Sequence, residues 1–174
     1  MNEINTKSLR EQVAAILAED PNAKTLLIAQ QLNVSEPEAL AAYPPELCTE
    51  LPGDSVKEII LRLEELGKVH VIVNSGSAIS ETFGEFGGFS EAGPFLNVST
   101  RSLHMHIMIH KINRVFAVSK TFNEIEKCNC SFQFFDNQGH SAFKVFIHSR
   151  IPERTSPIEK DYQVWNTIIS KFKN

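Results

Sequence analysis

Residues 130–149 read CSFQFFDNQGHSAFKVFIHS, two segments rich in Phe, Val and Ile on either side of the polar run DNQG. Aromatic and β-branched side chains favour extended backbone, and a polar run that ends in Gly favours a tight turn. The pattern therefore predicts an antiparallel hairpin with strands Cys130–Asp136 and Ser141–Ser149.

Upstream of this hairpin, the two-residue hydrophobic period begins after Gly67. The connections between the extended segments are short, which favours antiparallel pairing in one sheet. The run Lys111-Ile112-Asn113 is expected to join the last two of these segments as a second hairpin. The predicted strands are Lys68–Ser75, Ala78–Phe83, Phe95–Val98, Arg101–Lys111 and Arg114–Ser119.

Segments with a helical period of about 3.6 residues flank the predicted sheet. Three lie near the N-terminus, one precedes the first strand, and one follows Ser156-Pro157 near the C-terminus. The expected fold is α+β, an antiparallel β-sheet with N-terminal helices and a C-terminal helix. We expect one domain, residues 1–174, with a helical part at 1–45 and a sheet part at 55–174. The helices before the sheet are predicted at Ser8–Glu19, at Thr25–Leu32, after Ser35-Glu36-Pro37, and at Ser55–Gly67.

Composition limits the classes of protein that fit the chain. The 174 residues are 42% hydrophobic, enough for an ordinary core, and the three Cys do not form a disulfide framework. No apolar run approaches the roughly 18–20 residues that cross a bilayer, and no signal segment is evident, so we expect a cytoplasmic protein with no membrane partner. Seventeen basic and 21 acidic residues argue against a non-specific binder of nucleic acid.

A helix-turn-helix is one alternative for the N-terminal part, because residues 29–35 read AQQLNVS between two predicted helices. A recognition helix needs basic and amide side chains for base edges and phosphates. Residues 36–43 supply two Glu and no Lys or Arg. A structural role for these helices is therefore favoured over a transcriptional regulator.

The predicted strand Arg101–Lys111 carries the residues that most suggest chemistry. Side chains alternate faces along a strand, so His104, His106, Met108 and His110 share one side and apolar residues fill the other. Same-face neighbours are roughly 7 Å apart, which excludes a four-ligand metal cage built from this strand alone. Two interpretations stay open, an exposed polar face that uses His, or one or two axial ligands to a porphyrin iron.

Common enzyme motifs are missing from the sequence. It contains no Gly-x-Ser-x-Gly, Walker loop or His-Glu-x-x-His pattern, which favours binding or carriage over catalysis. The run Cys128-Asn129-Cys130 lacks the spacing of zinc knuckles, and we interpret it as structural.

Between Gly67 and Arg150, a series of short motifs follows in a characteristic order. The motifs are Gly67-Lys68-Val69, Gly84-Glu85-Phe86, Gly93-Pro94-Phe95, His106-Ile107, the run 131–139 and Phe143-Lys144-Val145-Phe146. Over about half of the chain this order resembles the HutX/ChuX family of heme-utilisation proteins. The resemblance implies an antiparallel-sheet α+β fold, a homodimer, and a cytoplasmic carrier or store that passes heme to a heme-degrading partner.

The resemblance also implies a heme site. His106 falls on the family's heme-associated histidine, whereas the second family histidine falls on Asn74. The site then has one protein ligand, or a substitute from His70, His104 or His110. Slot walls are expected from Phe86, Phe89 and Phe95, and propionate partners from Arg101, Lys111 or Lys120. The alternative activity is an enzyme that degrades or modifies the tetrapyrrole.

Overall fold

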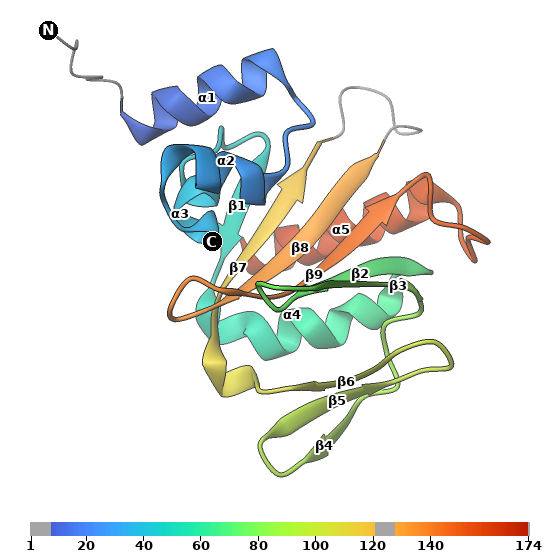
Figure 1. Ribbon diagram of the computed structural model, residues 1–174. Helices are drawn as coiled ribbons and strands as arrows, with labels where there is room; N and C mark the ends of the chain where they lie inside the picture. The colour runs from blue at the N-terminus through green and yellow to red at the C-terminus, as the bar shows by residue number, and fades with distance from the viewer. Residues whose placement is uncertain (1–7, 121–127, 174) are drawn as a thin grey trace, which may run out of the picture.

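The computed structural model describes residues 8–120 and 128–173, whose strands form two antiparallel sheets (Figure 1). Six strands form the larger sheet in the order β1-β7-β8-β9-β2-β3, and β4-β5-β6 form the smaller one. The strands of the larger sheet are β1 (Cys48–Leu51), β2 (Val69–Asn74), β3 (Ile79–Gly84), β7 (Ile112–Ser119), β8 (Asn129–Asp136) and β9 (Ser141–His148). Those of the smaller sheet are β4 (Ser90–Ala92), β5 (Phe95–Ser99) and β6 (His104–Ile107).

Helices lie where the helical periodicity predicts them. Capping boxes start the first and third helices, pairing Ser8 with Glu11 and Ser35 with Glu38, as the sequence pattern favours. The helices are α1 (Leu9–Glu19), α2 (Thr25–Leu32), α3 (Glu36–Ala41), α4 (Val56–Arg62) and α5 (Ile158–Phe172), with 3-10 turns η1 (Gly53–Ser55), η2 (Leu63–Glu65) and η3 (Ile109–Lys111). None of the helices in the described ranges is long and apolar enough to cross a bilayer.

The larger sheet is covered on both faces, but unequally. Helices α4 and α5 and the inner side of the smaller sheet contribute to one core on one face. Helices α1–α3 pack on the opposite face against β1, β7 and β8 (Figure 1). Within β8, Phe132 and Phe134 point into the first core and Phe135 into the second, and all three side chains are fully buried.

The hairpin of β8 and β9 forms as predicted from the opening stretch. The two strands pair from Asn129 opposite His148 to Phe135 opposite Ser141, with one irregularity near the turn. The Asp136 carboxylate accepts hydrogen bonds from the backbone N–H of Gln138 and His140, each at 2.8 Å. Gly139 adopts a φ of 83°, a left-handed conformation that glycine reaches without steric strain.

The prediction of one long strand over Arg101–Lys111 is wrong. Strand β6 ends at Ile107, and Ile109–Lys111 forms the turn η3. The next strand starts at Ile112 in the larger sheet, so the expected hairpin around Lys111-Ile112-Asn113 is also absent. The alternating pattern is real as far as Ile107, but sequence alternation does not reveal that the chain passes from one sheet to another after that point.

The expected single sheet is likewise replaced by two, with two strands that the sequence did not predict. Strand β1 lies in the Pro-rich connection at 43–54, and β4 has only three residues. Strand β1 pairs with β7, far along the chain, so its local sequence gave little signal.

The burial of α3 argues against the helix-turn-helix alternative. Helix α3 would be the recognition helix, but Glu36, Pro37, Ala39 and Leu40 are all buried. The Glu36 carboxylate is bonded to the Lys144 ammonium on the sheet. Burial of these four side chains leaves little of α3 to enter a DNA groove, which favours the predicted structural role.

The glycine-rich loop that precedes β5 packs closely against this strand at Gly88. This contact gives a prediction for the stability of the protein. Gly88 has a φ of 63°, and a Cβ there would lie 2.2 Å from the backbone oxygen of Ser99. Gly88→Ala is expected to lower the free energy of unfolding by about 3 kcal/mol, from backbone strain plus this clash. Gly93 is the matched control, because its φ is also positive, 56°, but a Cβ there meets nothing within 4 Å. Gly93→Ala should cost about 1 kcal/mol in urea unfolding, and equal losses for both variants would contradict the prediction.

Candidate functional site

The outer face of the smaller sheet collects three of the residues predicted for the site. Strand alternation turns Leu96 and Ile107 into the core, where both are buried. The opposite side of the same strands carries Phe95, Asn97, His104 and His106. Both histidines are exposed, which confirms that the polar side of this strand faces outward.

His106 is held by two neighbours on β5. Its Nδ1 lies 2.7 Å from the Oδ1 of Asn97, the residue directly opposite it in the strand pairing. The Phe95 ring and the imidazole pack edge to face, with centroids 5.9 Å apart and planes at 66°. Within the described residues Nε2 has no hydrogen-bond partner, so this nitrogen is available to bind a metal.

His104 and Arg101 lie farther along the same hairpin. His104 is opposite Ser99, with 3.3 Å between its Nδ1 and the hydroxyl oxygen. Arg101 is exposed in the turn between β5 and β6. The structure therefore brings Phe95, His104 and His106 onto one face, with Arg101 at its end, where a flexible cation can reach an anionic group.

Asn74 lies elsewhere. It is the last residue of β2, opposite Ile79 in the larger sheet. Its Oδ1 accepts the backbone N–H of Gly76 at 2.9 Å, which stabilises the turn into β3. No contact between Asn74 and His106 is present in the described part of the chain, so one copy of the chain does not pair them.

His70 does not replace the missing second histidine. Its Nδ1 lies 3.2 Å from Nε2 of His148, and its Nε2 lies 3.1 Å from a carboxylate oxygen of Glu81. Its ring stacks on Phe83 at 4.3 Å, so both nitrogens and one ring face are occupied. The third substitute, His110, lies in η3, off the face of β6.

Three of the residues expected around a ligand lie in other places. Phe86 is 1% exposed and stacks on Phe143 in the core, so its ring does not reach the outer face of the smaller sheet. Phe89 packs against that core beside Phe86. The Lys120 ammonium is bonded to the backbone oxygen of Ala23, near the N-terminal helices. Of the predicted wall residues, only Phe95 lies beside His106.

Sequence reasoning missed Asn97, although a signal for it exists. Asn97 is the polar residue between Leu96 and Val98, and alternation alone places it on the outer face. Its position opposite His106 depends on the register of β5 with β6, which the sequence does not determine. Within the described ranges, no group of three or more His, Cys, Asp or Glu is placed to hold a metal ion.

The buried His148 gives a pH prediction. The pKa of His148 is lowered from 6.5 to about 4. Burial is the largest cause, and the nearby charges of His70, Arg150 and Arg154 add to it. The unfolded chain then binds more protons than the folded one between these values, so stability falls as the pH drops from about 6.5 toward 4. His148→Gln should remove up to about 3 kcal/mol of this dependence in urea unfolding at a series of pH values. An unchanged dependence of stability on pH in the His148→Gln protein would refute the assignment.

This chain is similar to known proteins in both sequence and structure. The model of the family described as "Haem utilisation ChuX/HutX" matches residues 49–168. The intracellular heme transport protein HutX of Vibrio cholerae is 33% identical over 143 residues, which are 81% of this chain and 73% of that protein. The hemin transport protein HemS of Yersinia enterocolitica is 25% identical over 170 residues, 96% of this chain but 45% of HemS, so the chain spans about half of that relative.

A solved structure supports the fold independently. The structure of the heme binding protein ChuX superposes with a TM-score of 0.77, covering 96% of this chain and all of the other. The sequence identity in this pair is 22%, so the match shows a shared fold. It confirms the predicted α+β architecture of an antiparallel sheet with N-terminal helices and a C-terminal helix.

Proposed function

This chain belongs to the Haem utilisation ChuX/HutX family, and on that premise we propose that it binds heme and carries it within the cell. His106 is the axial ligand to the heme iron. The observation that carries the proposal is the geometry of this side chain: an exposed imidazole, held at Nδ1 by Asn97, with Nε2 open. Phe95 beside it gives the porphyrin an aromatic contact.

An open site suits a carrier. Heme has to leave again, so the affinity should be moderate, and a ligand on an exposed sheet face leaves without any opening of the core. Arg101 at the end of the hairpin pairs with a propionate, and His104 is a second imidazole on the same face. Heme then passes to a heme-degrading partner in the cytoplasm, and residues 1–174 act as a single heme-utilisation domain.

The second side of the site comes from another copy of the chain in this proposal. A single sheet face can cover only one side of the porphyrin, and the other side of the porphyrin stays open. HemS, matched over 96% of this chain but only 45% of its own length, is long enough to hold two such units. A homodimer of this chain likewise contains two such units. In this arrangement, Asn74 of the second copy contributes an amide near the heme rather than an iron ligand.

Titration with hemin tests the proposal. The Soret band should shift and the titration should saturate at a fixed ratio of heme to protein, measured by absorbance. Excess apomyoglobin should then remove the heme, as expected of a carrier. Incubation with a reductant and catalase should leave the Soret band intact. Loss of the band under these conditions would favour a tetrapyrrole-degrading enzyme. If the Soret band does not shift when hemin is added, the proposed heme binding is wrong.

A further inference from the structure

We propose that Asn97 is a positioning residue that fixes the tautomer of His106 and so selects Nε2 as the iron-binding nitrogen. This inference rests on the proposed function, because it concerns the same ligand. It adds to the site a residue that is not among those predicted from the sequence. The residues that carry it form a row across the three strands of the smaller sheet.

The row consists of Ser90, Asn97 and His106, which are directly opposite one another in β4, β5 and β6. The Asn97 Oδ1 lies 2.7 Å from Nδ1 of His106. On its other side, the Asn97 Nδ2 donates to the Ser90 hydroxyl at 3.3 Å. The amide is therefore engaged at both of its polar atoms, and its oxygen faces the imidazole.

The amide oxygen decides where the proton of the imidazole lies. A carbonyl oxygen can only accept, so the Nδ1 at 2.7 Å must carry the hydrogen and donate it. In a neutral imidazole the other nitrogen then has the lone pair. Nε2, which is open, is thus ready to coordinate iron without a tautomer change. The same bond fixes the ring orientation and increases the electron density of the ligand, as outer partners of metal-bound histidines do.

His104 and Ser99 form a second histidine pair on this face, but their contact does not select a tautomer. His104 has its Nδ1 3.3 Å from the hydroxyl of Ser99. A hydroxyl can donate or accept, so it selects neither tautomer, and the longer distance makes a weaker bond. Two histidines on one strand, both exposed, are therefore distinguished by the residues opposite them. This difference makes His106, not His104, the prepared ligand.

The test begins on the heme-free protein. Nitrogen NMR of histidine side chains should show His106 as the Nδ1–H tautomer in the wild type. Asn97→Leu should lose this preference, and Asn97→Asp, which keeps an accepting oxygen, should retain it. In hemin titrations, Asn97→Leu should bind about 10- to 100-fold more weakly, with Asn97→Asp close to the wild type. Ser99→Ala, the matched control beside His104, should change neither the His106 tautomer nor the heme affinity.

The two readouts separate this inference from the proposed function. If wild-type His106 carries its proton on Nε2, or if Asn97→Leu keeps the Nδ1–H form and the full heme affinity, the role of Asn97 is overturned. If the wild type shows the Nδ1–H tautomer but never binds hemin, the proposed function fails while the NMR result stands. The backbone amide spectrum of each variant verifies that the smaller sheet is still folded.

Discussion

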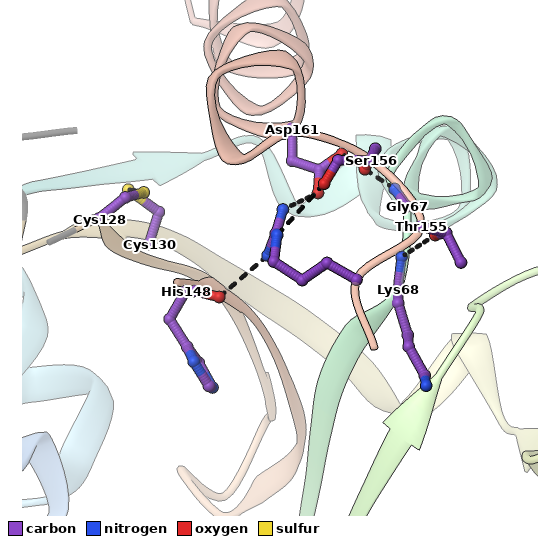
Figure 2. Close-up of polar contacts among 9 residues, drawn as sticks. Gly67, Lys68, Cys128, Cys130, His148, Thr155, Ser156 and Asp161 are labelled. Atoms are coloured by element: carbon purple, nitrogen blue, oxygen red, sulfur yellow. Dashed lines mark hydrogen bonds and ion pairs between the residues drawn. The ribbon is translucent and has the colours of Figure 1, made fainter. Parts of the chain in front are cut away.

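Asp161→Ala is expected to lower the free energy of unfolding by about 3–5 kcal/mol, the range for removing one partner of a buried ion pair. Asp161 is 0% exposed at the start of α5. Its carboxylate accepts from the guanidinium of Arg154 at 2.5 Å, from the hydroxyl of Ser156 at 2.6 Å and from the backbone N–H of Gly67 at 3.1 Å. Figure 2 shows Asp161 among these contacts, where the chain enters α5.

The expected loss of stability is large because removal of the Asp161 carboxylate leaves its hydrogen-bond donors without a partner. Without it, the Arg154 side chain, only 16% exposed, stays beside an apolar methyl group with one donor unpaired. Gly67 and Ser156 lose an acceptor at the same time, and these residues join α5 to the start of β2. The change should therefore weaken the contact between the helix and the sheet as well as the ion pair itself.

Urea unfolding, followed by the fluorescence of the single Trp165 and by circular dichroism, measures this loss. Glu159→Ala is the matched control, because Glu159 is an acidic residue in the same first turn but is exposed. It should change stability by about 0.5 kcal/mol or less. Equal stability changes in the two variants would show that the buried network contributes little.

His106→Ala is expected to weaken heme binding by about 100-fold or more, beyond the 10- to 100-fold typical of losing an outer partner. The substitution removes the nitrogen that we propose binds the iron, whereas the Phe95 ring beside it remains. The Soret maximum of the ferric complex should move toward that of free hemin. The side chain is exposed, so the fold should be unaffected.

His104→Ala is the matched control for this ligand. His104 is an exposed histidine of the same strand and the same face, two residues away, and its opposite residue is Ser99. Its removal should leave the Soret maximum in place and change the affinity by less than about 10-fold. If His104→Ala and His106→Ala have the same spectrum as the wild type, neither histidine is the ligand, and the assignment of His106 is wrong.

The sequence predicted the elements of this fold better than their pairing. Alternation and turn residues located β8 and β9, and the capping pair Ser8 and Glu11 located α1, because these signals are local. The transfer of the chain between sheets at Met108 depends on packing against α4 and the core, which no local pattern records. For the same reason β1, whose residues pair with residues of β7 that lie 64 to 70 positions later, was not predicted.

The candidate site was predicted in the same partial way. The side chains of His104 and His106 face outward, as alternation required, and Phe95 joins them through the pairing of β5 with β6. Asn97 could not be assigned without the register of that pair. His70 was a reasonable substitute by residue type, but its two nitrogens are already bonded in the fold.

The separation of the smaller sheet at Met108 has a consequence for hydrogen exchange. Among the residues that the structure describes, strands β4, β5 and β6 pair only with one another, whereas β8 lies inside the six-stranded sheet with a neighbour on each side. Local opening of a small, partly exposed unit requires less free energy than global unfolding. Amide hydrogens around His106 can therefore exchange through such openings while those of β8 remain protected. Heme held at His106, as proposed above, would therefore lie on a part of the protein that can fluctuate while the six-stranded sheet stays intact.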